Sequence, residues 1–479
     1  MKRNNDVETD ITIVIKDEEM KVLHMSKIGM NRGKKRIWLE FAFLQAADFR
    51  PGQRIKVSSS EERIEIEVVG TEAEGNRYVS RRGEEPLIEV PESLIAFADH
   101  VSKLRLVFTK HKITITPHHS YNREMSRVRR LIWKLANGLP LDLMSLFSGG
   151  GVFDRAAHEG LALNAIKSRL AVCVERETKF LASSMRNNSH LFDESSVLIN
   201  ANIEELDLST AGMEVDAAIV SIPCTGASRA GRSKNKIQSA EEHSSAGHLF
   251  YYALNWLCRS NVPIIQFECV KEYLSSTSMT VIRRVLECEG YELRETVLSG
   301  HDFGAIENRH RMIAIAYSKQ LSNVLGQFET DITHYHESSD KTVGDILESV
   351  SEGSQRYKSF DYLIEKEQRD IAAGKGFRRV LVKRSDRTVP VIGFDYAKCR
   401  SNEPFVPLDE QNPNGKSRLF TPTEHAAVKT VPLQIISGLP DTTAHQILGQ
   451  SGIYSKIRAV WQWIGASLMD PKLSLLSAS

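Results

Sequence analysis

Hydrophobic and polar residues alternate in short runs along the first 120 positions, which is the pattern of β-strands with one buried face. Charged residues or Gly/Pro turns separate the runs, as expected between strands. We therefore expect a small, mostly β domain over residues 1–120. Its strand-like runs are ITIVI, KRIWLEF, RIKVSSS, RIEIEVV, KLRLVF and KITIT.

The period changes to that of an α-helix between Asn122 and Asn137, and Gly138 and Pro140 end the helix. Apolar residues share one face of this predicted linker helix, residues 121–140. Basic residues lie largely on the other face, namely Arg123, Arg127, Arg130 and Lys134. Two interpretations stay open: the basic face contacts nucleic-acid phosphates, or it is simply solvated.

Beyond Pro140, strand-like apolar runs alternate with helix-like ones, which is typical of a parallel sheet with crossover helices. The runs are LDLMSLF, LAVCVE, VDAAIVSIP, PIIQFEC and RMIAIAY. We expect an α/β catalytic domain over residues 141–320. Periodicity fades across residues 321–415, and a last helical signal, IRAVWQWIGASL, follows within residues 416–479.

Composition narrows the class of protein without selecting a function. A chain of 479 residues with 41% hydrophobic and 26% charged residues has the composition of a globular protein with two or three domains. A formal net charge of +1 neither supports nor excludes a nucleic-acid partner. Six scattered cysteines without a CxxC pair predict a reduced protein with no metal site. No secretory signal or run of 18 apolar residues is present, so we expect a cytoplasmic protein.

A glycine-rich turn between a strand and a helix is the first sign of chemistry. In LDLMSLFSGGGVFDRA, glycines allow close approach of a ligand to the backbone, and the helix N-terminus offers free N–H groups. The next strand ends at Glu175, which follows Gly151 by 24 residues, about where a carboxylate would accept hydrogen bonds from ribose. Together they indicate a cofactor that contains adenosine.

Three further signals lie at strand ends, where parallel sheets bind ligands. Cys224 follows Pro223 directly after one strand, and Glu268 ends the next. Arg309 and Arg311 alternate at the entrance to another strand and so project to one side. Each has a structural explanation when taken alone, because buried cysteines are usually inert and acidic or basic residues often form ion pairs. Their order along the chain makes that explanation harder to sustain for all of them.

Ordered motifs from about Leu141 to Leu468 resemble those of the DNA cytosine-5 methyltransferases. FSGGG resembles the family's cofactor loop, Pro223-Cys224 with Ser228 its nucleophile loop, and Glu268-Cys269-Val270 its Glu-Asn-Val. ENRHR falls on its Gln-x-Arg-x-Arg, RLFTPTEHA on the motif beside target recognition, and GQSGIYSKIRAVWQWIGASL on its last motif. The resemblance implies a Rossmann-like methyltransferase domain that uses S-adenosyl-L-methionine. It also implies an inserted target-recognition domain at 321–415 and a C-terminal part, 416–479, that returns to the catalytic domain.

The resemblance also implies roles for single residues. Catalysis would rest on a covalent bond between Cys224 and C6 of a flipped-out cytosine, with Glu268, Arg309 and Arg311 assisting. The implied cofactor-binding residues are Phe147, Ser148, Gly149, Gly150, Gly151, Glu175, Asn202, Pro223, Gln450 and Ser451. The loop after Cys224 is suited to grip DNA phosphates through Arg229, Arg232, Lys234 and Lys236.

Four residues depart from the family's pattern. Ser145 and Asn202 stand where aspartates are usual, and Thr225 and Glu307 stand where glutamines are usual. These departures bear on cofactor affinity and on the level of activity. Two alternatives stay open. An RNA cytosine-5 methyltransferase of the same family would share the cofactor loop, the cysteine and the glutamate, and a catalytically degenerate regulator that binds DNA is favoured by Ser145 and Asn202.

Partners and location follow from the same resemblance. We expect double-stranded DNA as the substrate and no membrane, in a nucleoid-associated protein encoded by a prokaryote, phage or plasmid. A restriction endonuclease is a hypothetical partner. The stretch RIWLEFAFLQAADFRPGQRIKV loosely resembles the swapped-hairpin barrels of the AbrB and MazE type, which suggests that the N-terminal domain binds DNA or forms a homodimer.

Overall fold

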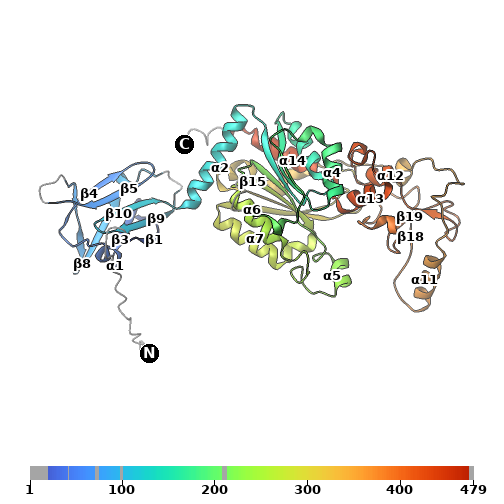
Figure 1. Ribbon diagram of the computed structural model, residues 1–479, viewed down its shortest axis with the longest axis horizontal. Coiled ribbons are helices and arrows are strands. Elements are labelled where there is room, and N and C mark those ends of the chain that lie inside the picture. The colour runs from blue at the N-terminus through green and yellow to red at the C-terminus, as the bar shows by residue number, and fades with distance from the viewer. Residues whose placement is uncertain (1–19, 41, 71–74, 98–100, 208–212, 474–479) are drawn as a thin grey trace. The chain divides into compact units, whose positions relative to one another are not determined.

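The computed structural model describes residues 20–40, 42–70, 75–97, 101–207 and 213–473 (Figure 1). The predicted strand ITIVI, at residues 11–15, lies outside these ranges. Two compact units divide the chain between Met125 and Ser126. Within the described ranges, no helix combines the length and apolar character needed to cross a membrane.

The N-terminal unit consists of two antiparallel sheets around one apolar core. Alternate residues of its strands point inward, including Ile37, Leu39, Ile64 and Ile66, as the alternating sequence predicts. The larger sheet has the order β1 (Val22–Lys27), β9 (Lys103–Thr109), β10 (Lys112–Pro117), β5 (Ile64–Val68), β4 (Arg54–Ser59) and β6 (Arg77–Tyr78). The smaller has the order β2 (Gly29–Asn31), β3 (Lys34–Glu40), β8 (Glu85–Pro91) and β7 (Ser80–Arg82), and α1 (Ala42–Ala46) follows β3. The likeness to AbrB-type barrels stays a prediction.

The second unit contains a seven-stranded sheet in which only β17 runs antiparallel to its neighbours. The order is β13 (Val197–Ile199), β12 (Ser168–Val174), β11 (Leu141–Leu146), β14 (Ala217–Ser221), β15 (Ile264–Val270), β17 (Arg311–Ser318) and β16 (Tyr291–Leu298). Successive strands are added on opposite sides of β11, so the chain changes direction between β11 and β14. Ligands bind at such a switch point, beyond the carboxyl ends of the strands.

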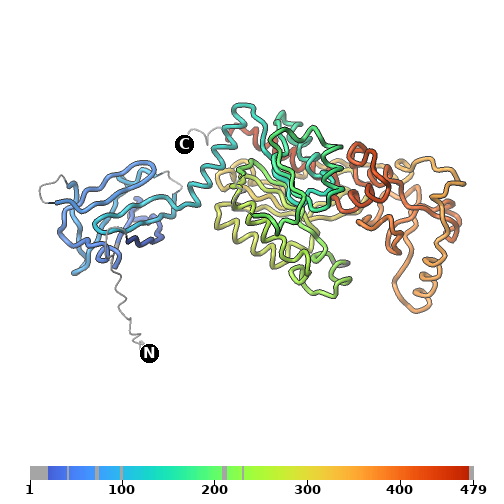
Figure 2. Tube along the Cα trace, viewed as in Figure 1, coloured from blue at the N-terminus to red at the C-terminus, as the bar shows by residue number. Residues whose placement is uncertain are grey.

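Helices cover both faces of this sheet through two separate apolar cores. The first core includes residues of α3 (Val152–Ala162), α4 (Thr178–Asn187) and α14 (Tyr454–Leu468). The second includes residues of α6 (Leu249–Arg259) and α7 (Thr277–Cys288). The C-terminal α14 returns to lie beside α3 (Figure 2). Gly160 makes this approach possible, because a Cβ there would lie 2.4 Å from the Arg458 carbonyl oxygen.

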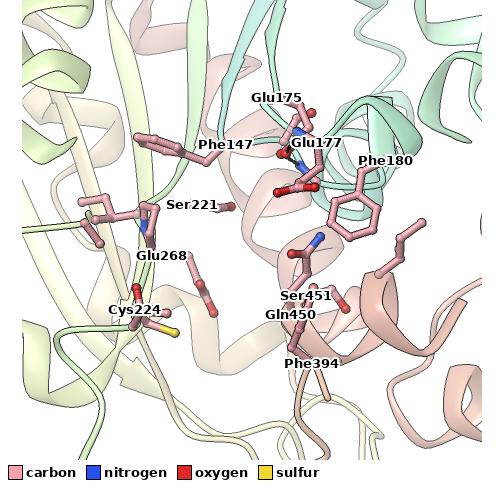
Figure 3. Close-up of a pocket in the computed structure, with 18 of the residues that line it drawn as sticks. Phe147, Glu175, Glu177, Phe180, Ser221, Cys224, Glu268, Phe394, Gln450 and Ser451 are labelled. Carbon is pink, nitrogen blue, oxygen red and sulfur yellow. Dashed lines mark hydrogen bonds between the residues drawn. The ribbon is translucent and has the colours of Figure 1, made fainter. Parts of the chain in front are cut away.

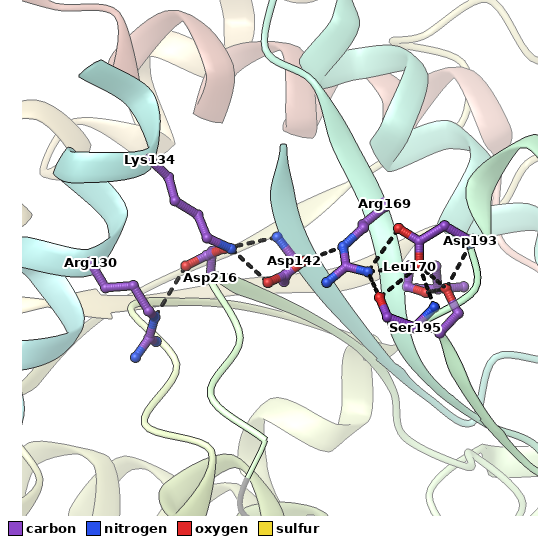
Figure 4. Close-up of polar contacts among 9 residues, drawn as sticks. Arg130, Lys134, Asp142, Arg169, Leu170, Asp193, Ser195 and Asp216 are labelled. Carbon is purple, nitrogen blue, oxygen red and sulfur yellow. Dashed lines mark hydrogen bonds and ion pairs between the residues drawn. The ribbon is translucent and has the colours of Figure 1, made fainter. Parts of the chain in front are cut away.

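The basic face of α2 (His119–Ala136) is used inside the protein. Arg127 is fully buried, and its Nε donates to Ser318 Oγ over 2.9 Å. Arg130 and Lys134 both pair with the buried Asp216, at 3.2 and 2.5 Å (Figure 4). For these three side chains both sequence-based interpretations are wrong, since they are neither solvated nor free for phosphates. The pattern of charge on the helix could not reveal Asp216, which lies 86 residues after Arg130 and 82 after Lys134.

Residues 321–415 contribute to three apolar cores. The short helices α8 (Ser322–Leu325) and α9 (Phe328–Asp331) contribute to the first core of the large sheet. A separate small core includes Ile306 and Val343, the latter in α10 (Val343–Ile346), and a further one contains Phe360, Leu363 and Phe405. The remaining elements are α11 (Asp361–Ala372), β18 (Val380–Leu381), β19 (Pro404–Pro407), β20 (Ser417–Arg418), α12 (Pro422–Val428) and α13 (Asp441–Gln450).

Candidate active site

A cavity of about 680 Å³ opens at the carboxyl ends of β11, β12, β14 and β15 (Figure 3). This is the switch point of the sheet, where the strand order predicts a ligand site. The volume falls in the range typical of small-molecule sites, roughly 300–1,000 Å³. Predicted cofactor-loop residues and predicted catalytic residues line the same cavity.

The loop after β11 is held by Glu175, at the end of the neighbouring strand. Oε2 of Glu175 accepts a 2.8 Å hydrogen bond from the Gly149 N–H, and Oε1 accepts one of 2.8 Å from the Glu177 N–H. Burial raises the pKa of Glu175, and the two backbone donors oppose this effect. A carboxylate has about four lone-pair sites, so these bonds leave acceptor capacity that faces the cavity.

The glycines of this loop differ in what their lack of a side chain makes room for. Gly149 and Gly150 line the cavity, and a Cβ on Gly149 would lie 2.8 Å from Gln450 Nε2. Gly151 is not among the lining residues, which differs from the predicted cofactor contact. It adopts a φ of +74°, and a Cβ there would lie 2.3 Å from Ser184 Oγ, on α4. Gly151 therefore serves the close packing of the loop against α4.

The other predicted cofactor residues also line the cavity, namely Phe147, Ser148, Asn202, Pro223, Gln450 and Ser451. Asn202 donates from Nδ2 to Glu205 Oε1 over 2.9 Å, so its amide group has a partner outside the cavity. Ile203 and Leu249 add apolar surface.

The four predicted catalytic residues, Cys224, Glu268, Arg309 and Arg311, come together in the cavity wall. Strand pairing places Glu268 beside Ser221, three residues before Cys224. Arg311 Nε lies 3.7 Å from Glu268 Oε1. Arg309 is 4% exposed, and burial and the neighbouring Arg311 lower its pKa. One carboxylate, two guanidinium groups and a thiol thus share one partly enclosed space.

Two of these side chains keep unused hydrogen-bonding capacity. Within the described residues, Nε and Nη1 of Arg309 and Oε1 of Glu268 have no hydrogen-bond partner. Unsatisfied buried polar atoms are rare and call for an explanation such as a bound ligand. Both side chains line the cavity, so a ligand there could satisfy them.

The nucleophile loop continues into α5 (Arg229–Asn235). Ser228 caps this helix, and its Oγ accepts from the Gly231 N–H over 3.0 Å. Of the predicted phosphate-binding residues whose side chains are described, namely Arg232, Lys234 and Lys236, none lines the cavity. Lys234 and Lys236 are exposed, Arg232 donates to the Gln238 carbonyl oxygen over 3.4 Å, and the side chain of Arg229 lies outside the described part of the structure.

Sequence motifs missed part of the cavity wall. Residues of α4 and of the segment 391–403 line it, including Phe180, Val391, Phe394 and Glu403. The Phe180 and Phe394 rings lie 6.2 Å apart in an edge-to-face arrangement. Phe180 could have been suspected, because it lies in the helix that begins just after Glu175. The segment 391–403 carries no motif that would have indicated it.

Comparisons with known proteins agree with this arrangement. A family model for C-5 cytosine-specific DNA methylases matches residues 141–462. The type II methyltransferase M.SsoII of Shigella sonnei is 25% identical over 334 residues, which cover 68% of this chain and 80% of the relative. M.DsaV of Dactylococcopsis salina, also a type II methyltransferase, is 28% identical over 255 residues, or 52% of this chain and 68% of the relative.

Two solved structures share the fold at low sequence identity. The Dnmt2 methyltransferase of S. pombe superimposes with a TM-score of 0.51 at 17% identity, over 69% of this chain and 99% of the other. The Entamoeba histolytica methyltransferase EhMeth gives a TM-score of 0.53 at 19% identity, again over 69% and 99%.

Proposed function

The chain belongs to the C-5 cytosine-specific DNA methylases, and from that premise we propose that it methylates C5 of a flipped-out cytosine in double-stranded DNA through a covalent Cys224 intermediate. The observation that carries the proposal is the shared cavity. It joins Glu175 and the glycine loop to Cys224, Glu268, Arg309 and Arg311. A methyl donor and a base would thus meet in one enclosed space.

The residues of the cavity fit S-adenosyl-L-methionine. The Glu175 carboxylate is held by two backbone N–H groups and retains lone pairs for ribose hydroxyls. Phe147, Ile203 and Leu249 offer apolar surface for an adenine ring, and Gln450 and Ser451 offer polar groups to the rest of the molecule. When bound, this group supplies an electrophilic methyl group.

Cys224 has the central chemical role. Cytosine C5 is too weak a nucleophile to take a methyl group unaided, so the thiolate adds to C6 and makes C5 enamine-like. After C5 has gained the methyl group, a base removes the C5 proton, the C6–S bond breaks and the thiolate leaves. The Cys224 side chain lines the cavity and is partly exposed to it, as this addition requires.

Glu268, Arg309 and Arg311 stabilise charge on the base during addition. Glu268 would bind N3 and the amino group of cytosine, and its Oε1, which accepts no hydrogen bond from the described residues, is suited to that contact. Arg309 would bind O2 through donors that have no hydrogen-bond partner among the described residues. Extrusion of the base from the duplex costs a few kcal/mol, which contacts of this kind offset.

DNA that carries 5-fluorocytosine tests this mechanism, because fluorine cannot leave as a proton and the C6–S bond persists. We expect the wild type to be trapped covalently and Cys224→Ser not to be. Cys288→Ser is the matched control, since that thiol is exposed and outside the cavity. Trapping by Cys224→Ser would overturn the assignment of the nucleophile.

The choice of substrate is tested separately. We expect methyl transfer to double-stranded DNA and not to tRNA, and the opposite result would favour an RNA methyltransferase. The relatives are named type II methyltransferases, which supports a modification role beside a restriction endonuclease. Bisulfite sequencing of DNA from expressing cells would give the recognised sequence, and an endonuclease partner should cut that same sequence.

A further inference from the structure

Glu307 and Lys429 form an ion pair that is sealed from solvent. Lys429 Nζ lies 2.7 Å from Glu307 Oε2, and both side chains are 0% exposed. Glu307 precedes Arg309 in the loop before β17, and Lys429 follows α12. A buried ion pair carries a large desolvation cost, so it adds little net stability and indicates a role in fixing one arrangement of chain segments.

The Glu307 carboxylate also binds a second segment. Its Oε1 accepts a 2.7 Å hydrogen bond from the Ile392 N–H. Two backbone bonds reinforce this contact, from Asn308 N–H to the Val389 carbonyl over 2.9 Å and from Val389 N–H to the Ile306 carbonyl over 3.0 Å. Residues 391 and 393, on either side of Ile392, line the cavity. Glu307 therefore fixes one wall of the cavity.

Lys429 contacts a second segment that lines the cavity. Its Nζ lies 3.4 Å from the Ser451 carbonyl oxygen, and Ser451 lines the cavity. The backbone carbonyl of Lys429 accepts from the Tyr454 N–H over 3.1 Å, at the start of α14. The same pair thus holds the polypeptide that follows α13.

Arg309 also contacts this ion pair. Its Nη1 lies 3.6 Å from Glu307 Oε1, and its backbone N–H donates to the Glu307 carbonyl over 2.8 Å. Burial raises the pKa of Glu307, but the Lys429 and Arg309 charges outweigh burial and leave the pKa below its usual value. The Glu307 carboxylate therefore lies between the Lys429 and Arg309 side chains, which favour its charged form.

We propose that the Glu307–Lys429 pair is a positioning element, which holds Arg309 and the walls at residues 391–393 and 451 in the arrangement that the reaction needs. The catalytic part of this inference rests on the proposed function. A glutamine at position 307 could accept from Ile392, but it could not neutralise Lys429. Glu307, which stands where the family usually has glutamine, thus supplies the negative charge that pairs with Lys429.

Three variants test the pair: Glu307→Gln, Lys429→Met and the double variant. Per folded molecule, we expect each single variant to lower kcat at least tenfold with KM for DNA within threefold. The double variant should recover at least tenfold over the worse single variant, because it removes both members of the 2.7 Å pair and leaves neither Lys429 nor Glu307 as a buried charge without the other. Glu424→Gln is the matched control, since it breaks the buried Arg418–Glu424 pair, at 2.6 Å, which lies outside the cavity. The control should lose thermal stability and keep kcat within twofold.

Hydrogen exchange gives a readout that does not need activity. The amides of Val389 and of residues 391–393 should exchange at least tenfold faster in Glu307→Gln than in the wild type, and their exchange should be unchanged in Glu424→Gln. Single variants with kcat within twofold, or unchanged exchange at 389–393, would overturn the proposal. A wild type that methylates no cytosine would instead overturn the proposed function, and the exchange result would then decide the role of the pair.

Discussion

The Ser145 hydroxyl donates a hydrogen bond of 2.6 Å to the Asp154 carboxylate, and both side chains are 1% exposed. Ser145 lies in β11 and Asp154 in the first turn of α3, so the bond spans the two ends of the glycine loop. The family resemblance leads one to expect an acid at position 145. The structure instead has an acid within hydrogen-bond distance of that position, contributed by the following helix, and burial raises the pKa of Asp154 to about 7.

Asp154→Asn should remove a pH dependence of stability. Because the folded pKa of about 7 exceeds the usual 3.8, the stability that this group contributes is complete below pH 3.8 and is lost as the pH rises through about 7. The loss is on the order of 4 kcal/mol, from about 1.4 kcal/mol per pKa unit. Asparagine keeps an acceptor for Ser145 and does not titrate. Urea unfolding at pH 5 and pH 8 measures the free energy of unfolding of both proteins. The value for the variant should rise relative to that of the wild type between pH 5 and pH 8. An equal difference between the two proteins at both pH values would contradict the assignment.

Glu175→Ala should weaken S-adenosyl-L-methionine binding without abolishing folding. The substitution removes the proposed ribose contacts and also the two backbone bonds that hold the loop at Gly149 and Glu177. Hydrogen bonds to a charged group contribute roughly 1.5–3 kcal/mol, so we expect the dissociation constant to rise about 10- to 100-fold. Isothermal titration measures it. Glu194→Ala, at an exposed acid outside the cavity, should bind normally, and equal affinity in both variants would exclude Glu175 from the site.

Lys234→Ala combined with Lys236→Ala should reduce the salt dependence of DNA binding. Both lysines are exposed beside the nucleophile loop. Each lost phosphate contact should flatten the plot of log affinity against log salt by about 0.9, or about 1.8 for two. The methylated sequence should not change, because phosphate contacts carry no base information. Lys319→Ala with Lys472→Ala, two exposed lysines outside the cavity, is the control, and an equal slope in both double variants would remove α5 from the interface.

The sequence was sufficient to predict those site residues that lie at the ends of strands. The parallel sheet brings Cys224, Glu268 and the loop at Gly149 to one edge, so motifs far apart in sequence predicted a common site. Residues that act through packing were harder to assign. Gly151 has the positive φ of a loop glycine, yet the atom it accommodates belongs to Ser184, on a helix that the motif does not include.

Tertiary partners explain the remaining differences. The period of α2 correctly predicted a helix, but whether Arg127 is solvated or buried depends on Ser318, 191 residues away. Glu307 was noted only as a departure from a family pattern. The structural role of Glu307 depends on Lys429, and nothing in the sequence predicts a contact between these two positions. Phe394 reaches the cavity from a stretch without periodicity, where sequence offers no basis for placing a side chain.

Asp216 gives a test of stability that should leave the chemistry intact. It is fully buried at the amino end of β14, where it accepts from Arg130 Nε at 3.2 Å, Lys134 Nζ at 2.5 Å and the Asp142 N–H at 2.8 Å. Removing one partner of a buried charge pair costs about 3–5 kcal/mol. We therefore expect Asp216→Ala to lower the free energy of unfolding by about that amount, whereas Asp193→Ala, at the exposed end of the same network, should cost much less.

The cavity lies at the carboxyl ends of the strands, so kcat per folded molecule and cofactor affinity of Asp216→Ala should match the wild type. The basic residues of α2 should also leave DNA binding unchanged. Lys134→Met removes a cation that already pairs with Asp142 at 2.6 Å and with Asp216, so no counterion-releasing phosphate contact is lost. Its salt slope should equal that of the wild type, in contrast to the α5 variant. A flatter slope for Lys134→Met would show that DNA competes for this lysine, and the basic face of α2 would then belong to the interface after all.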